Sequence, residues 1–118
     1  MTFTLCVALA TSGGAQTQTA MNAGAGQDFL QADHKLNEVY QAISKKISPA
    51  GRSALQEAER TWVKFRDQEC TFETMGSVDG SIHPMLVAGC KTDLTQQRSK
   101  GLEKLLTCQE GDVACGGQ

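Results

Sequence analysis

Residues 55–70 read LQEAERTWVKFRDQEC, and the apolar side chains of this stretch follow a helical spacing. The stripe has spacings of three, four, three and seven positions and consists of Leu55, Ala58, Trp62, Phe65 and Phe72. Such a stripe is typical of an amphipathic helix that buries one face. Trp62, the only tryptophan, lies in the middle of the stripe, where a large aromatic ring contributes most apolar area. The stretch is therefore predicted to be the central helix of the fold, with its charged residues facing solvent.

The length of 118 residues suits a single domain. A formal net charge of −2 argues against a nucleic-acid-binding protein, because such proteins present a basic face. The same mild acidity is compatible with a cationic protein partner. No apolar run approaches the length of a membrane span.

Five cysteines in so short a chain need an explanation. The sequence has no Cys-x-x-Cys pair, and its only histidines, His34 and His83, do not stand at zinc-finger spacing from a cysteine pair. We therefore expect no metal site and no cofactor. Disulfide bonds remain as the interpretation, and they imply an oxidising compartment, either the periplasm or the outside of the cell.

The first residues agree with that location. Residues 3–10 form a short apolar run that ends in Ala8-Leu9-Ala10, which resembles a signal-peptidase site. We interpret residues 1–10 as a signal peptide with a shortened start, since no Lys or Arg precedes the run. Its removal would take Cys6 away and leave four cysteines. Residues 11–26, rich in Gly, Ala, Thr and Gln, are expected to form a flexible leader.

Three helices are predicted over residues 27–107, and no strand. The first begins at residue 27, and its apolar face comprises Phe29, Leu36, Tyr40, Ile43 and Ile47. Ser48-Pro49 ends it and opens the central helix, because Ser is a good N-cap and Pro is tolerated in the first turn. Residues 74–89, with several Gly and Ser, are predicted to be a loop. The face of the third helix comprises Leu86, Cys90, Leu94, Leu102, Leu105 and Leu106. The fold class is thus all-α, with the first two helices as an antiparallel hairpin.

Four remaining cysteines allow three pairings. Cys70–Cys90 and Cys108–Cys115 are favoured, because each pair brackets a glycine-containing loop with no further cysteine inside it. The second pair would close residues 108–118 as a small tail. The sequence alone does not exclude the two other pairings.

Five short motifs occur in order along the chain. They are Met21-Asn22-Ala23, Ala32-Asp33-x-x-Leu36-Asn37-x-x-Tyr40, Trp62-x-x-x-Arg66-Asp67-x-x-Cys70, Gly80-Ser81-Ile82 and Cys90-x-x-x-Leu94-Thr95-x-x-Arg98. Together they resemble the lysozyme inhibitor LprI-like family of small bacterial envelope proteins, over roughly residues 17–106. The resemblance implies a secreted or envelope-attached helical domain. For the namesake of the family it also implies inhibition of lysozyme.

Two positions depart from the family pattern. The family usually has Cys where this chain has Gly24, and often another Cys about ten residues earlier, where Gly13 and Gly14 stand. Losing both partners of a bridge leaves no orphan thiol. Glu59 replaces a frequent Gln, a swap that we expect to face solvent.

Polar residues near the helix seams have a structural and a catalytic interpretation. Asp33, Asn37 and Arg66 are expected to form a polar network that holds the first two helices in register, because a guanidinium fork satisfies a carboxylate and an amide together. Arg98 is expected to pair with an acid on the central helix. A catalytic site is the alternative, with carboxylates and His34 or His83 as bases. No motif dictates that chemistry, so we expect no enzyme.

The loop over residues 74–89 is the candidate for partner binding, through Ser77, Ser81, Ile82 and His83. A Cys70–Cys90 bond would clamp its ends and lower the entropy lost on docking. A narrow projection with hydrogen-bond donors suits the deep cleft of a lysozyme, which cleaves with a Glu and an Asp. Two alternatives remain: the loop is a simple connector, or the domain is a structural or adaptor module of the cell envelope without anti-lysozyme activity.

Overall fold

The computed structural model describes residues 17–109 and 111–117. The signal peptide expected over residues 1–10 lies outside the described residues. The described chain contains three α-helices and two short 3₁₀ helices and no strand, so the all-α prediction is confirmed. The elements are α1 (Gln18–Ser44), α2 (Pro49–Glu73), η1 (Met75–Ser77), α3 (His83–Glu103) and η2 (Lys104–Thr107). None of the described helices is long and apolar enough to cross a membrane.

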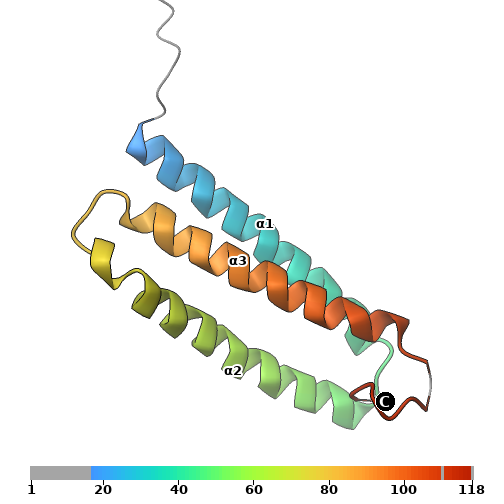
Figure 1. Cartoon of the computed structure of the whole chain (residues 1–118). Helices are drawn as coiled ribbons and strands as arrows, with labels where there is room; N and C mark the ends of the chain where they lie inside the picture. The colour runs from blue at the N-terminus through green and yellow to red at the C-terminus, as the bar shows by residue number, and fades with distance from the viewer. Residues whose placement is uncertain (1–16, 110, 118) are drawn as a thin grey trace, which may run out of the picture.

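The three α-helices lie lengthwise beside one another (Figure 1). α1 and α2 run in opposite directions, joined by residues 45–48, as expected for a helical hairpin. The most extensive packing, however, is between α1 and α3, which run in the same direction. Small side chains allow this close approach, because Ala32 on α1 and Thr95 and Ser99 on α3 are buried. α2 contributes larger side chains to its contacts, including Trp62, which packs against the core.

α1 begins earlier than expected. Residues 18–26, expected to be part of a flexible leader, are helical. Thr17 caps this helix, since its hydroxyl oxygen accepts a hydrogen bond from the backbone N–H of Ala20 at 3.1 Å. Gln18 also reaches α3, with its Nε2 atom 3.8 Å from Met85 Sδ. A good cap and contacts with α3 outweigh the low helix propensity of the glycines in this stretch.

The buried face of α2 is rotated from the one that the sequence predicted. Leu55 and Trp62 pack against the core, as expected. Phe65 and Phe72 are 51% and 69% exposed, and the face continues instead through two buried residues, Arg66 and Cys70. The spacing of four from Trp62 to Arg66 to Cys70 keeps these residues on one side, which turns both phenylalanines outward. Ala58 is exposed as well, so the predicted stripe is correct at Leu55 and Trp62 and wrong at Ala58, Phe65 and Phe72.

The hydrophobic core lies toward the end of the bundle opposite the α2–α3 connection. Its buried members are Leu36, Val39, Ile43 and Leu102, with Ile47, Leu55, Trp62, Leu105 and Leu106 packed against them. On α3 the predicted face is correct at Leu102 but wrong at Leu86, which is 40% exposed. Thr95 and Ser99 take the buried positions instead, because α1 leaves room for small side chains only.

Two disulfide bonds fasten the fold. Cys70 is bonded to Cys90 and Cys108 to Cys115, which are the pairs that the sequence favoured. The tail folds back on the start of α2, where the carbonyl oxygen of Gly117 accepts a hydrogen bond from the backbone N–H of Ser48 at 2.9 Å. A Cβ atom at Gly51 would overlap the backbone of Gly117, so this contact needs a glycine.

Candidate protein-binding site

The connection between α2 and α3 is shorter than the loop predicted over residues 74–89. Thr74 ends α2, η1 follows, and α3 already begins at His83, with Pro84 in its first turn. Proline is tolerated there because the first-turn N–H groups have no partner within the helix. Residues 84–89 are therefore helical, and we use "connecting loop" for residues 74–82 (Figure 1).

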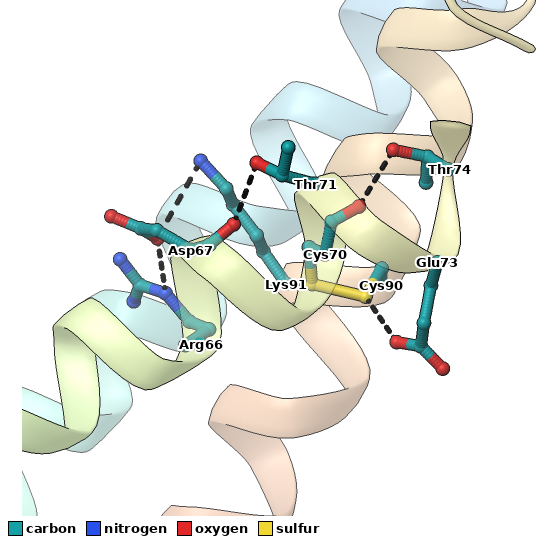
Figure 2. The surroundings of a disulfide bond; sticks show 8 residues. All are labelled: Arg66, Asp67, Cys70, Thr71, Glu73, Thr74, Cys90 and Lys91. Atoms are coloured by element: carbon teal, nitrogen blue, oxygen red, sulfur yellow. Dashed lines mark hydrogen bonds and ion pairs between the residues drawn. A yellow bond between two sulfur atoms is a disulfide. The ribbon is translucent and has the colours of Figure 1, made fainter.

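The Cys70–Cys90 bond clamps the two ends of the connecting loop (Figure 2). Cys70 lies in the last turns of α2 and is fully buried, whereas Cys90 on α3 is partly exposed. The hydroxyl of Thr74 donates a hydrogen bond to the carbonyl oxygen of Cys70 at 2.6 Å. Across the seam, Lys91 Nζ lies 3.6 Å from an oxygen of Asp67. The connecting loop therefore projects from a rigid base, which the bonded ends of α2 and α3 form.

Ligand atoms of Cys70, Glu73 and Cys90 lie within 4.8 Å of one another. A Glu73 oxygen is 2.9 Å from Cys90 Sγ, but this is a contact and not a hydrogen bond from sulfur, because a disulfide sulfur carries no hydrogen (Figure 2). Metal ions bind the thiolate form of cysteine. The bonded pair therefore offers no thiolate ligand.

Hydrogen bonds within the loop hold two of the predicted binding residues. Ser77 Oγ lies 2.9 Å from His83 Nδ1 and 3.0 Å from the carbonyl oxygen of Thr74. The one hydroxyl hydrogen can serve only one of these acceptors at a time, so His83 Nδ1 donates when Ser77 donates to Thr74. Ser77 and His83 are half-buried in this pair, whereas Ser81 and Ile82 are exposed. Asn22 of α1 donates to the carbonyl oxygen of Ser81 at 2.9 Å and ties the loop to a second helix.

Large apolar side chains on the connecting loop and on the helices beside it are open to solvent. Phe72, Met75 and Val78 are 69%, 64% and 64% exposed, and Ile82 and Leu86 about 40%. We call these five residues the apolar tip. Exposed apolar residues gathered at one place mark interaction sites more often than single ones do. Of these five residues, the binding site predicted from the sequence contains only Ile82, because the helical spacing predicts that Phe72 and Leu86 lie in the core. The apolar residues among the Gly and Ser of residues 74–82 are the signal that could have revealed Met75 and Val78.

The same end of the bundle is acidic. Residues 17–30 and 67–93 contain one lysine, Lys91, and six carboxylates: Asp28, Asp67, Glu69, Glu73, Asp79 and Asp93. Only Asp79 belongs to the connecting loop, so the other carboxylates stand on the helices behind it. This part of the surface attracts cations at long range.

Comparison with known proteins identifies the family. The family model described as lysozyme inhibitor LprI matches residues 8–102. The chain belongs to the LprI family. That match covers α1 and α2 completely and reaches Leu102 in the last turn of α3. An uncharacterized protein of Rhizobium meliloti strain 1021, R02472, is 33% identical over 109 residues, which cover 81% of this chain and 78% of that protein. No solved structure matches.

Arg66, a motif residue of this LprI-family chain, lies at the centre of a polar cluster between α1 and α2. Its guanidinium carbon lies 4.9 Å from the centre of the Phe29 ring and 5.4 Å from that of the Trp62 ring. Its Nε donates a hydrogen bond to Asp67 at 3.0 Å, and its NH1 group is 3.5 Å from Asp33. The second distance is long for a hydrogen bond, so Asp33 contributes an ion pair.

One member of the expected polar network, Asn37, differs from the prediction. Asn37 is exposed, and its side chain makes no hydrogen bond with any described residue, although it lines a pocket between α1 and α2. Arg98 pairs with an acid on α2, as predicted. The acid is Glu59, at 2.6 Å, and its side chain is only 15% exposed. The expectation that Glu59 faces solvent is therefore wrong, since Arg98 draws it into the seam between α2 and α3.

Proposed function

We propose that this protein inhibits a lysozyme by inserting the connecting loop into the substrate cleft of the enzyme. The observation that carries the proposal is a clamped loop with exposed apolar side chains in a chain that belongs to the LprI family. Membership in the family supports a lysozyme as the partner. The proposed setting is an oxidising compartment, the periplasm or the cell exterior, because both disulfides need one.

The shape of the loop suits a cleft. Helix faces are broad and convex, whereas residues 74–82 form a narrow turn at one end of the bundle (Figure 1). The Cys70–Cys90 bond and the Asn22–Ser81 hydrogen bond fix the loop before it binds. Less conformational freedom is then lost on docking, which increases affinity.

The charges suit the surroundings of a lysozyme cleft. Peptidoglycan carries carboxylates, and an enzyme that binds an anionic polymer gains from a positive surface around its cleft. The connecting loop carries a single charge, Asp79, so most of it can approach the catalytic Glu and Asp of the enzyme without repulsion. The carboxylates on the helices behind it would face the positive rim. In this arrangement Val78, Ser81 and Ile82 bury apolar and hydrogen-bonding groups in the cleft.

A lysis assay with purified protein tests the proposal. Wild-type protein should slow the lysis of bacterial cells by at least one animal or bacterial lysozyme. The double variant Val78→Ser/Ile82→Ser should weaken inhibition at least tenfold, about 1.4 kcal/mol, because it removes apolar contact from the loop. Val63→Ser is the matched control, since Val63 is exposed on the middle of α2.

Both variants change exposed positions, so their melting temperatures should stay close to that of the wild type. Unchanged potency of the double variant would exclude the loop as the contact. Undiminished lysis by every lysozyme tested would contradict the proposed function and leave the adaptor alternative.

A further inference from the structure

A groove of about 620 Å³ runs between the first turns of α1 and α3, beside the connecting loop. Met21 and Met85 line its apolar sides, and Leu86 belongs both to the groove and to the apolar tip. Asp28 and Asp93 place one carboxylate on each helix. Flexible methionine side chains adapt to ligands of different shape. The groove is thus apolar where the methionines line it and acidic at the end where Asp28 and Asp93 stand, since they are the last lining residues of the two parallel helices.

Two glycines keep the groove open. A Cβ atom built at Gly24 or Gly89 meets no atom within 4 Å, so helix packing does not require glycine at either position. A glycine inside a helix also lowers the stability of the helix relative to other residues. What the two glycines contribute is space, since any larger side chain would project into the groove that they line.

The two carboxylates of the groove have no partner within the described residues. Neither Asp28 nor Asp93 takes part in an ion pair or a hydrogen bond there, in contrast to Asp33 and Asp67, which pair with Arg66. The nearby cation Lys91 is paired with Asp67. Among the described residues, no basic side chain therefore pairs with either carboxylate of the groove. A cationic side chain of another protein could bind them without displacing a residue of this chain.

We propose that this groove receives a lysine or arginine side chain of the partner. The stem of such a side chain is apolar and would lie against Met21, Met85 and the bare glycine positions, while its cationic head reaches Asp28 and Asp93. The inference rests on the proposed function, in which the partner is a lysozyme with a positive rim. Because Leu86 joins the groove to the apolar tip, one partner can cover both.

Groove-filling variants test this without weakening the fold. Gly24→Leu/Gly89→Leu replaces both glycines with a better helix former, so its melting temperature should rise while its affinity for lysozyme falls at least tenfold. Gly101→Leu is the control, because Gly101 is also in α3 with open space at its Cβ position but lies outside the groove. It should raise the melting temperature and leave the affinity unchanged. Asp28→Asn/Asp93→Asn should also weaken binding tenfold and make it less sensitive to salt.

The possible outcomes distinguish a failure of the groove proposal from a failure of the proposed function. If the wild type binds a lysozyme and all these variants bind equally well, the groove assignment is wrong and the proposed function stands. If the wild type binds no lysozyme, the proposed function fails, and an NMR titration with tetralysine decides about the groove. Saturable shifts of the Gly24 and Gly89 amides, lost in Asp28→Asn/Asp93→Asn, would support a site for basic side chains. Their absence in the wild type would overturn it.

Discussion

Arg66 is the only buried charged residue among the residues that the structure describes, and it lies between α1 and α2. It is only 6% exposed and contacts Phe29, Trp62 and two carboxylates. Arg66→Ala should lower the free energy of unfolding by about 2–3 kcal/mol, because it removes the cation–π contacts, leaves Asp33 without its cation and leaves Asp67 with Lys91 alone.

Urea denaturation measures this loss. Arg60→Ala is the control, because Arg60 is exposed and, among the described residues, pairs only with Glu57 one turn away. Such a surface pair contributes less than about 0.5 kcal/mol. Equal stability losses in the two variants would mean that Arg66 has no structural role.

Individual residues also show which contacts can be predicted from the sequence and which cannot. The pairing of Arg98 with an acid of α2 was predictable from charge and position, but the burial of Arg66 in place of Phe65 was not. Helical periodicity assigns Phe to the core and Arg to the surface. Arg66 is buried because the ring of Phe29, on a different helix, lies beside it. That contact exists only after the helices have packed.

At the scale of elements, the Cys70–Cys90 bond joins the end of α2 to α3 and sets the shape of the connecting loop. The bridged cysteines are 20 positions apart, so the chain-entropy model gives a loss of about 3 kcal/mol for Cys70→Ser/Cys90→Ser. Inhibition should weaken as well, because the loop is no longer held.

Cys108→Ser/Cys115→Ser is the comparison variant for the same chemical and thermal unfolding measurements. Its cysteines are 7 positions apart, so the bond restricts a shorter ring and its removal should cost less. It should also leave inhibition unchanged, since the tail lies at the opposite end of the bundle from the loop (Figure 1). A larger loss of stability or inhibition in this variant would contradict the assigned role of the Cys70–Cys90 bond.

The helices were predictable as elements, but not their limits. Ser48-Pro49 marked the start of α2 correctly. The start of α1 was missed because residues 18–26 contain two glycines and owe their helical state partly to contacts with α3. The start of α3 was placed too late, since Gly and Ser dominate the sequence before His83 and Pro84 was not recognised as a first-turn residue.

In the whole molecule, charge is distributed unevenly, which the overall composition does not reveal. A net charge of −2 indicates an almost neutral protein, yet six of the 13 carboxylates and one of the 11 basic residues fall in residues 17–30 and 67–93. Only the up-down-up arrangement of the helices brings those two stretches together at one end. The proposed partner-binding surface therefore combines the predicted loop with the apolar tip and with the carboxylates on the helices behind the loop, an arrangement that no single segment shows.

We propose that this end of the molecule occupies the substrate cleft of a lysozyme. The most direct test is inhibition kinetics with a short soluble chitooligosaccharide substrate, which binds only in the cleft. A protein that fills the cleft competes with the substrate, so KM should rise in proportion to inhibitor concentration while kcat stays constant. A fall in kcat at unchanged KM, or no effect on either constant at concentrations that block cell lysis, would show that the protein does not occupy the cleft.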